Sequence, residues 1–87
     1  SVLAEGIEAS THQVMKNLQA ILTEAGMTFN NVVKATIFLK SMDDFAVMND
    51  IYASYFEGGN FPARETVQVS CLPKNVDVEI SMIAHQD

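Results

Sequence analysis

Residues 32–40 decide the fold, and they read Val32-Val33-Lys34-Ala35-Thr36-Ile37-Phe38-Leu39-Lys40. Because successive side chains of a strand point to opposite faces, a strand here has one apolar face and one mixed face. The apolar face holds Val33, Ala35, Ile37 and Leu39, and the mixed face holds Val32, Lys34, Thr36 and Phe38. Both faces therefore carry apolar side chains, which predicts an interior strand with a neighbour on each side.

The segment before this strand, from Ile7 to Ala25, has the pattern of an amphipathic helix. Its apolar stripe recurs at the helical period, with charged and amide side chains mostly off the stripe. The stripe consists of Ile7, Thr11, Val14, Leu18, Ile21, Leu22 and Ala25. Gly26 follows and predicts the helix end, since glycine readily adopts the left-handed conformation found there.

A second helix is predicted after the strand. Ser41 and Asp44 resemble a capping box, with Asp in place of the usual Glu, and Gly58 and Gly59 predict the helix end. The buried stripe of this helix is Phe45, Met48, Asn49, Tyr52, Tyr55 and Phe56. Asn49 in this stripe could contact a ligand, but a buried, hydrogen-bonded amide is the simpler interpretation.

Two further strands are predicted over 65–71 and 76–84, joined through Leu72-Pro73-Lys74-Asn75. The apolar face of the last strand consists of Val76, Val78, Ile80, Met82 and Ala84. The order α-β-α-β-β predicts a single α/β domain over residues 1–87, with two helices on one face of a mixed sheet. The other sheet face is half polar, which suits a subunit interface or a ligand-lined interior, and oligomerisation would cover the open sheet edges.

Composition narrows the function. The formal charge is −6, from 5 Lys and Arg against 11 Asp and Glu, so a nucleic-acid surface of clustered cations is not expected. The single cysteine excludes an internal disulfide and a thiolate-rich metal site, and Cys71 beside Leu72 is interpreted as a small buried hydrophobe. No apolar run is long enough to span a bilayer and no export leader is recognisable, so we expect a cytoplasmic protein with no membrane partner and no metal.

Arg64 and Glu79 are the candidate site residues. Arg64 is the only arginine, and its planar, always-charged fork matches a carboxylate. By parity it lies on the polar face of its strand, which also carries Thr66, Gln68 and Ser70. If the last two strands pair as a hairpin, Arg64 and Glu79 both face the mixed side, where they could bind and hydrolyse a small acid. On this geometry alone, an interfacial salt bridge is the simpler interpretation.

A family resemblance extends along the chain. The matching C-terminal blocks are Pro62-Ala63-Arg64, Val67, Ser70, Leu72-Pro73-Lys74 and Val78-Glu79-Ile80. The matching upstream blocks are Thr11-His12-Gln13-Val14, Asn17-Leu18, Val32-Val33-Lys34-Ala35-Thr36, and Asp44-Phe45 with Asn49 and Tyr52. In their order and spacing, these blocks resemble the RidA (YjgF/YER057c/UK114) family over all 87 residues.

The resemblance implies a chorismate mutase-like α/β fold, assembled as a homotrimer with active sites at the subunit interfaces. It implies a 2-iminobutanoate/2-iminopropanoate deaminase. Such an enzyme hydrolyses reactive 2-imino and enamine acids to 2-oxo acids and ammonia, and it uses no cofactor. Removing these reactive acids prevents metabolite damage. By the matching motif, Arg64 would clamp the substrate carboxylate, and Glu79 would position the attacking water or move protons. The backbone at Thr66, where relatives often have cysteine, would help to hold that water.

Two departures from the family pattern keep an alternative open. Glu65 follows the arginine where relatives usually have a small or apolar residue, and a carboxylate there could weaken anion binding. The chain also lacks the N-terminal hairpin region of the family, which adds a tyrosine and a serine-glycine segment to the pocket. We therefore expect an N-terminally incomplete domain. The resemblance does not imply that these 87 residues are active alone. The alternative to the enzyme is a non-catalytic, trimeric protein that binds small carboxylates, with a regulatory or translation-linked role. Ribonuclease activity, known in some relatives, fits the charge of −6 poorly.

Overall fold

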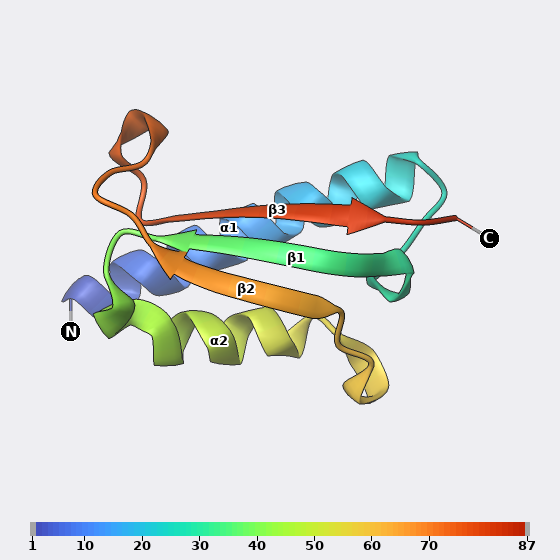
Figure 1. Ribbon diagram of the computed structural model, residues 1–87, viewed down its shortest axis with the longest axis horizontal. Coiled ribbons are helices and arrows are strands. Elements are labelled where there is room, and N and C mark those ends of the chain that lie inside the picture. The colour runs from blue at the N-terminus through green and yellow to red at the C-terminus, as the bar shows by residue number, and fades with distance from the viewer. Residues whose placement is uncertain (1, 87) are drawn as a thin grey trace.

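The computed structural model describes residues 2–86, with side chains at 6–56 and 58–86. Its helices are α1 (Val2–Glu24) and α2 (Phe45–Ser54), and its strands are β1 (Val32–Leu39), β2 (Ala63–Gln68) and β3 (Val78–Ala84). Both helices pack on one face of the three-stranded sheet, as Figure 1 shows, which confirms the predicted α-β-α-β-β architecture. No helix in this described part is long and apolar enough to cross a membrane.

β1 is the central strand of the sheet, which has the order β2-β1-β3. It runs parallel to β2 and antiparallel to β3. The predicted interior position of this strand is confirmed, and the hairpin that the parity argument assumed for the last two strands does not occur. The physical reason is that β1 carries apolar side chains on both faces and is best covered with a neighbour on each side, so β2 and β3 occupy its opposite edges.

The end of α1 follows the prediction. Gly26 has a φ of +77°, and its N–H donates to the carbonyl of Thr23 at 3.0 Å. The N–H of Met27 donates to the carbonyl of Leu22 at 2.8 Å, which completes a Schellman motif. Because Met27 then packs against the core, this motif directs the chain toward β1.

The buried side of α1 differs from the predicted stripe at three positions, one of which is Ala25, a stripe residue that is exposed. Ile21 is 66% exposed, whereas Met15, which the stripe did not include, is fully buried. The fully buried positions follow the turn of the helix through Ile7, Thr11, Met15 and Leu22. Successive residues of a helix are rotated by about 100°, so the residue next to Leu22 falls on the flank and its side chain reaches solvent.

The predicted capping box of Ser41 and Asp44 does not form; only its Ser41 half is present, one short turn before α2. Ser41 Oγ accepts from the N–H of Asp43 at 3.2 Å and caps a 3-10 turn, Met42–Asp44, while Asp44 makes no side-chain capping bond at the start of α2. Burial raises the pKa of the Asp44 carboxyl above its ordinary value of 3.8, and the negative charges of Asp77 and Asp43 raise it further. Ionised Asp44 is therefore a destabilising group.

Asp44→Asn should raise the melting temperature at about pH 7 and have little effect at about pH 3. The folded state holds the Asp44 proton more tightly than the unfolded chain does, so stability is lost as the pH rises from 3.8 through the raised pKa. The neutral amide avoids this loss. Thermal unfolding across this pH range, followed by circular dichroism, measures the difference, and equal melting temperatures at neutral pH would contradict it.

Tyr52 lies in the core with a hydroxyl that has no hydrogen-bond partner. The side chain is only 2% exposed, and its ring centroid lies 4.9 Å from that of Phe56. Burial raises the pKa of the hydroxyl above its ordinary value of 10.0, and the charge of Arg64 partly opposes this rise. The hydroxyl therefore stays protonated at neutral pH as a buried, unpaired donor.

Tyr52→Phe should leave the free energy of unfolding unchanged or raise it by about 1 kcal/mol. The substitution keeps the ring in the core and removes a hydroxyl whose burial without a partner costs free energy. Urea unfolding of the two proteins measures the difference. A loss of more than about 1 kcal/mol would show instead that the hydroxyl makes a stabilising hydrogen bond.

Candidate functional site

The chain returns from α2 to β2 through a glycine turn. Gly58 and Gly59 have φ values of +64° and +73°, a left-handed conformation that favours glycine. Pro62 then precedes β2, whose second residue is Arg64. The turn thereby brings the arginine back alongside the helix that the chain has just left.

The guanidinium of Arg64 rests on one face of α2. Its Nη1 donates a hydrogen bond to Oδ1 of Asn49. Its Cζ lies 5.6 Å from the ring centroid of Phe45 and 5.3 Å from that of Tyr52, which are cation–π distances. Because positions 45, 49 and 52 are spaced i, i+4 and i+7, one helix face presents two rings and an amide to the arginine. Asn49 is thus a half-buried amide with the predicted hydrogen bond.

A cavity of about 420 Å³, hereafter the Arg64 cavity, opens beside this arginine. Its lining comes from α2 and from the segment that leads into β2, and consists of Asn49, Tyr52, Ala53, Phe61, Pro62 and Arg64. Arg64 is the charged member of this lining; it uses one N–H donor on Asn49 and keeps the others for a ligand. The cavity therefore combines a guanidinium fork with walls that are partly polar and partly apolar.

Thr66 faces the same side of the sheet as Arg64. In the parallel register Arg64 pairs with Ala35 and Thr66 pairs with Ile37. Paired residues on adjacent strands point to the same face, and Ala35 and Ile37 are fully buried under the helices. The Thr66 hydroxyl is therefore in the helix-facing layer, where it is buried without a hydrogen-bond partner.

Glu79 lies on the opposite face of the sheet. It pairs with Phe38 in the antiparallel register, and Phe38 points away from the face that buries Ile37 and Leu39. The prediction that Arg64 and Glu79 of one chain face the same side is therefore wrong. The parity argument assumed that β2 and β3 pair as a hairpin. Because β1 lies between them, β2 turns the face that carries Arg64 toward α2, while β3 turns the face that carries Glu79 outward.

Glu65 faces away from Arg64, as its parity predicted. Its Oε1 lies 3.3 Å from Nζ of Lys34, across the pair of β1 and β2. The two side chains are 61% and 47% exposed, and ion pairs in such surroundings contribute little stability. Glu65 is thus engaged on the outer sheet face, the face that also carries Glu79, and not beside the guanidinium.

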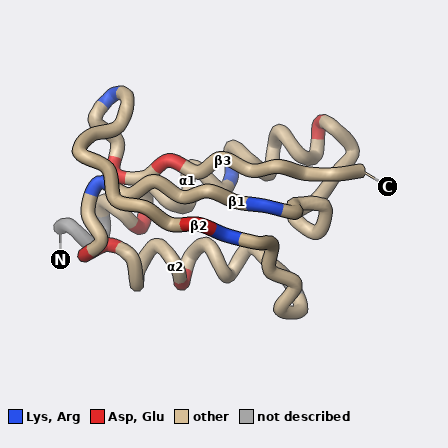
Figure 2. The backbone as a smooth tube through the Cα atoms, in the orientation of Figure 1, with Lys and Arg blue, Asp and Glu red and all other residues tan. Residues whose placement is uncertain are grey.

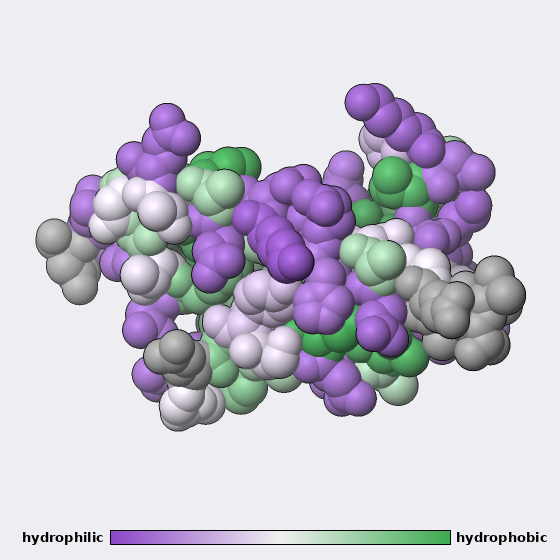
Figure 3. All heavy atoms as spheres, turned by 180° about the vertical axis from the view of Figure 1, so that it is seen from behind, coloured by the Kyte–Doolittle hydropathy of each residue, from purple (hydrophilic) through white to green (hydrophobic). Residues whose placement is uncertain are grey.

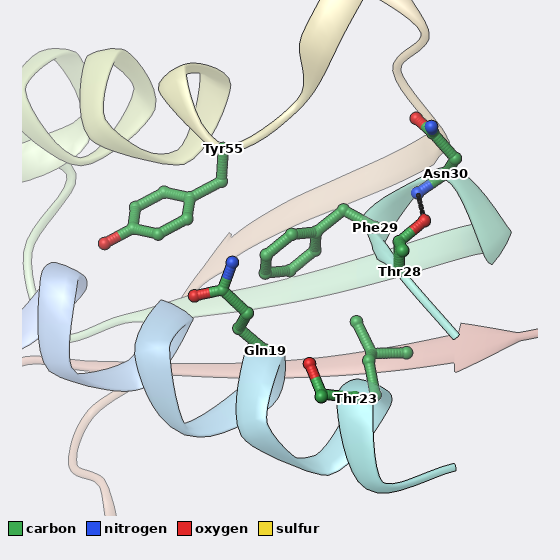
Figure 4. A pocket seen from close by; sticks show the side chains of 7 residues that line it. Gln19, Thr23, Thr28, Phe29, Asn30 and Tyr55 are labelled. Atoms are coloured by element: carbon green, nitrogen blue, oxygen red, sulfur yellow. Dashed lines mark hydrogen bonds between the residues drawn. The ribbon is translucent and has the colours of Figure 1, made fainter. Parts of the chain in front are cut away.

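A second hollow, of about 230 Å³, lies between α1 and the short 3-10 turn Phe29–Asn31 that precedes β1. Figure 4 shows the amide of Gln19 pointing toward the space between the rings of Tyr55 and Phe29, with Thr23 below it. All the residues that line this hollow are uncharged. Because it offers no group for an anion, we assign the candidate site to the Arg64 cavity instead.

The cysteine and the helical histidine have surroundings that explain them structurally. Cys71 is exposed, contrary to the predicted buried hydrophobe, because β2 ends at Gln68 and leaves Cys71 in the loop that follows. Nδ1 of His12 lies 2.8 Å from the hydroxyl oxygen of Tyr55, so this hydrogen bond links α1 to the end of α2. Among the side chains that the structure describes, at 6–56 and 58–86, no three His, Cys, Asp or Glu residues lie in position to hold a metal ion.

Known proteins share this sequence pattern. The family model described as Endoribonuclease L-PSP matches residues 1–86. The mouse protein named 2-iminobutanoate/2-iminopropanoate deaminase is 48% identical over 81 residues, which are 93% of this chain and 59% of that protein. A Lactococcus lactis protein whose name proposes a regulator, AldR, is 49% identical over 83 residues, which are 95% of this chain and 65% of that protein.

The fold is shared as well. The crystal structure of the YjgF gene product of E. coli matches with a TM-score of 0.87 at 40% identity, over 93% of this chain and 65% of that one. The chain thus spans less than two thirds of the length of each of these relatives. Because the family model covers nearly the whole chain and the fold agrees, the chain belongs to the Endoribonuclease L-PSP family, which is the RidA (YjgF) family that its motifs predicted.

Proposed function

We propose that this protein hydrolyses 2-imino acids such as 2-iminobutanoate and 2-iminopropanoate to 2-oxo acids and ammonia. The observation that carries the proposal is the Arg64 cavity, in which a guanidinium held by Asn49 and two rings keeps free donors next to about 420 Å³ of space. A planar fork of this kind suits a substrate carboxylate. The name of the mouse relative supports the reaction.

The second residue of the proposed site, Glu79, has to come from another copy of the chain. Within one chain, Arg64 and Glu79 lie on opposite faces of the sheet and pair with β1 residues three positions apart, at Ala35 and Phe38. A shared crevice therefore needs the helix-facing edge of β2 from one protomer and the outer sheet face of its neighbour.

The outer sheet face is suited to be that interface. Val67 and Ile83 on this face are 41% and 60% exposed, and Phe38, which pairs with Val67, is half-buried. The view from behind, by contrast, shows a surface on which hydrophilic side chains predominate, with smaller hydrophobic patches among them (Figure 3). Because the two contacting surfaces are different, the contact is heterologous, and such a contact forms a ring when the rotation between neighbours closes. The homotrimer implied by the family resemblance is a ring of this kind.

In the proposed reaction, the imine carbon is already electrophilic, so positioning and one proton carrier suffice. Arg64 binds the carboxylate, and the carboxylate of Glu79 takes a proton from water as the oxygen attacks the imine carbon. That proton passes to the imine nitrogen and gives a carbinolamine. Glu79 then carries the hydroxyl proton to the same nitrogen, the carbon–nitrogen bond breaks, and ammonia leaves as the carbonyl forms. β2 is an edge strand, so backbone groups at Thr66 that do not pair with β1 can hold the attacking water.

Replacing the arginine tests the carboxylate clamp. In the full chain, Arg64→Ala should lower kcat/KM for freshly generated 2-iminobutanoate by about 10- to 100-fold, the range expected for hydrogen bonds to a charged group. Arg64→Lys should recover only part of this loss, because an ammonium keeps the charge but not the fork. Ammonia release is measured, with Lys16→Ala on the surface of α1 as the control cation, and an undiminished rate for Arg64→Ala would reject the enzyme proposal.

Mixing two inactive variants tests whether the site is shared. Arg64→Ala chains and Glu79→Ala chains, each inactive alone, should regain activity when they are unfolded and refolded together. With random assembly, about one site in four receives an intact Arg64 from one chain and an intact Glu79 from its neighbour, so about a quarter of the wild-type rate is expected. The double variant refolded alone serves as the control, and no recovery in the mixture would place both residues in one chain's site.

The second candidate function is binding of small carboxylates without catalysis. It is favoured by the name of the Lactococcus lactis relative, which proposes a regulator. Tight binding of 2-oxobutanoate by a protein that hydrolyses no imine would support it. The nuclease in the description of the family model is disfavoured, because the net charge is −6 and the five Lys and Arg positions lie dispersed along the fold (Figure 2).

A further inference from the structure

The Arg64 cavity is larger than the smallest imino acids require. Its volume of about 420 Å³ falls within the range of pockets that enclose drug-sized ligands, whereas 2-iminobutanoate has only four carbons. Arg64 and Asn49 supply the polar end of the cavity. A small substrate anchored at that end therefore leaves the apolar part of the cavity uncovered.

The apolar wall is held in place and stands partly open. The ring of Phe61 is 56% exposed, and its centroid lies 6.0 Å from that of Phe56, which is itself buried in the core. Pro62 next to it is rigid and half-buried. An exposed aromatic ring fixed against the core, within reach of a carboxylate-binding arginine, favours a ligand that has an acid group at one end and apolar surface at the other.

We infer that the Arg64 cavity holds the substituent of the substrate, so that the protein prefers 2-imino acids with a branched aliphatic or aromatic substituent. This inference rests on the proposed function for its imine, and its binding part can be measured without any reaction. Each methylene that becomes buried should strengthen binding by about fourfold. Because Arg64 is the charged residue of the lining, dicarboxylic acids are excluded from the preferred class: their second carboxylate finds no cation there.

Binding to the stable 2-oxo acids tests the cavity directly. In titration calorimetry with the full chain, 4-methyl-2-oxopentanoate and phenylpyruvate should bind at least tenfold more tightly than 2-oxobutanoate, and 2-oxoglutarate should bind most weakly. Phe61→Ala should reduce this ratio of affinities by about five- to tenfold, and Phe61→Leu should give an intermediate ratio. Ile21→Ala removes an equally exposed apolar side chain from α1 and should leave the ratio unchanged.

The same ratio is then measured in hydrolysis, with imines generated in place from alanine, leucine and phenylalanine. A size preference that depends on Phe61 in binding, but no hydrolysis of any imine, would reject the proposed function and leave the cavity assignment standing. Hydrolysis of small imines with no size preference, or a preference untouched by Phe61→Ala, overturns the inference alone. A changed assembly mass in Phe61→Ala with an unchanged ratio overturns it too, because the ring would then belong to a subunit contact.

Discussion

The structure depends on β1 having a neighbour on each side. Because this strand carries apolar side chains on both faces, it is buried most fully in the middle of the sheet, and β2 and β3 must then lie at opposite edges. That single arrangement determines which way the polar residues of both outer strands point. It places Arg64 on the helix-facing side of the sheet and Glu79 on the open side, so the two side chains of one chain face in opposite directions.

Arg64 shows how a site can be built on a packed helix face. The spacing of Phe45, Asn49 and Tyr52 along α2 offers the guanidinium two rings and an acceptor, which fixes its position while most of its donors stay available. The same neighbourhood contains two buried hydroxyls without partners, on Tyr52 and Thr66. Unpaired buried polar groups lower stability, and one of the two, Tyr52, lies against the guanidinium and lines the Arg64 cavity.

Much of the fold followed from local patterns, and the misplaced details have a common cause. The two helices, the glycine end of α1 and the central strand were predictable because period, capping and alternation act within a few residues, whereas α2 ends at Ser54, four residues before the predicted Gly58. The pairing of the last two strands was not predictable, because strand pairing is decided by contacts between distant segments. The common face expected for Arg64 and Glu79 depended on that pairing. In the same way, Ile21 and Met15 exchanged roles because the contact of α1 with α2 and β3 selects which part of a broad apolar stripe is buried.

The sequence by itself determined the class of the protein: the order of its elements, its family, and the arginine that its motif singles out as an anion-binding residue. Only the tertiary structure decided which face of the sheet this arginine occupies, that Asn49 and two rings hold it, and that a partly apolar cavity opens beside it. The reason is physical. Local order depends on neighbours along the chain, whereas the side to which an edge strand turns its polar residues depends on which strand lies beside it.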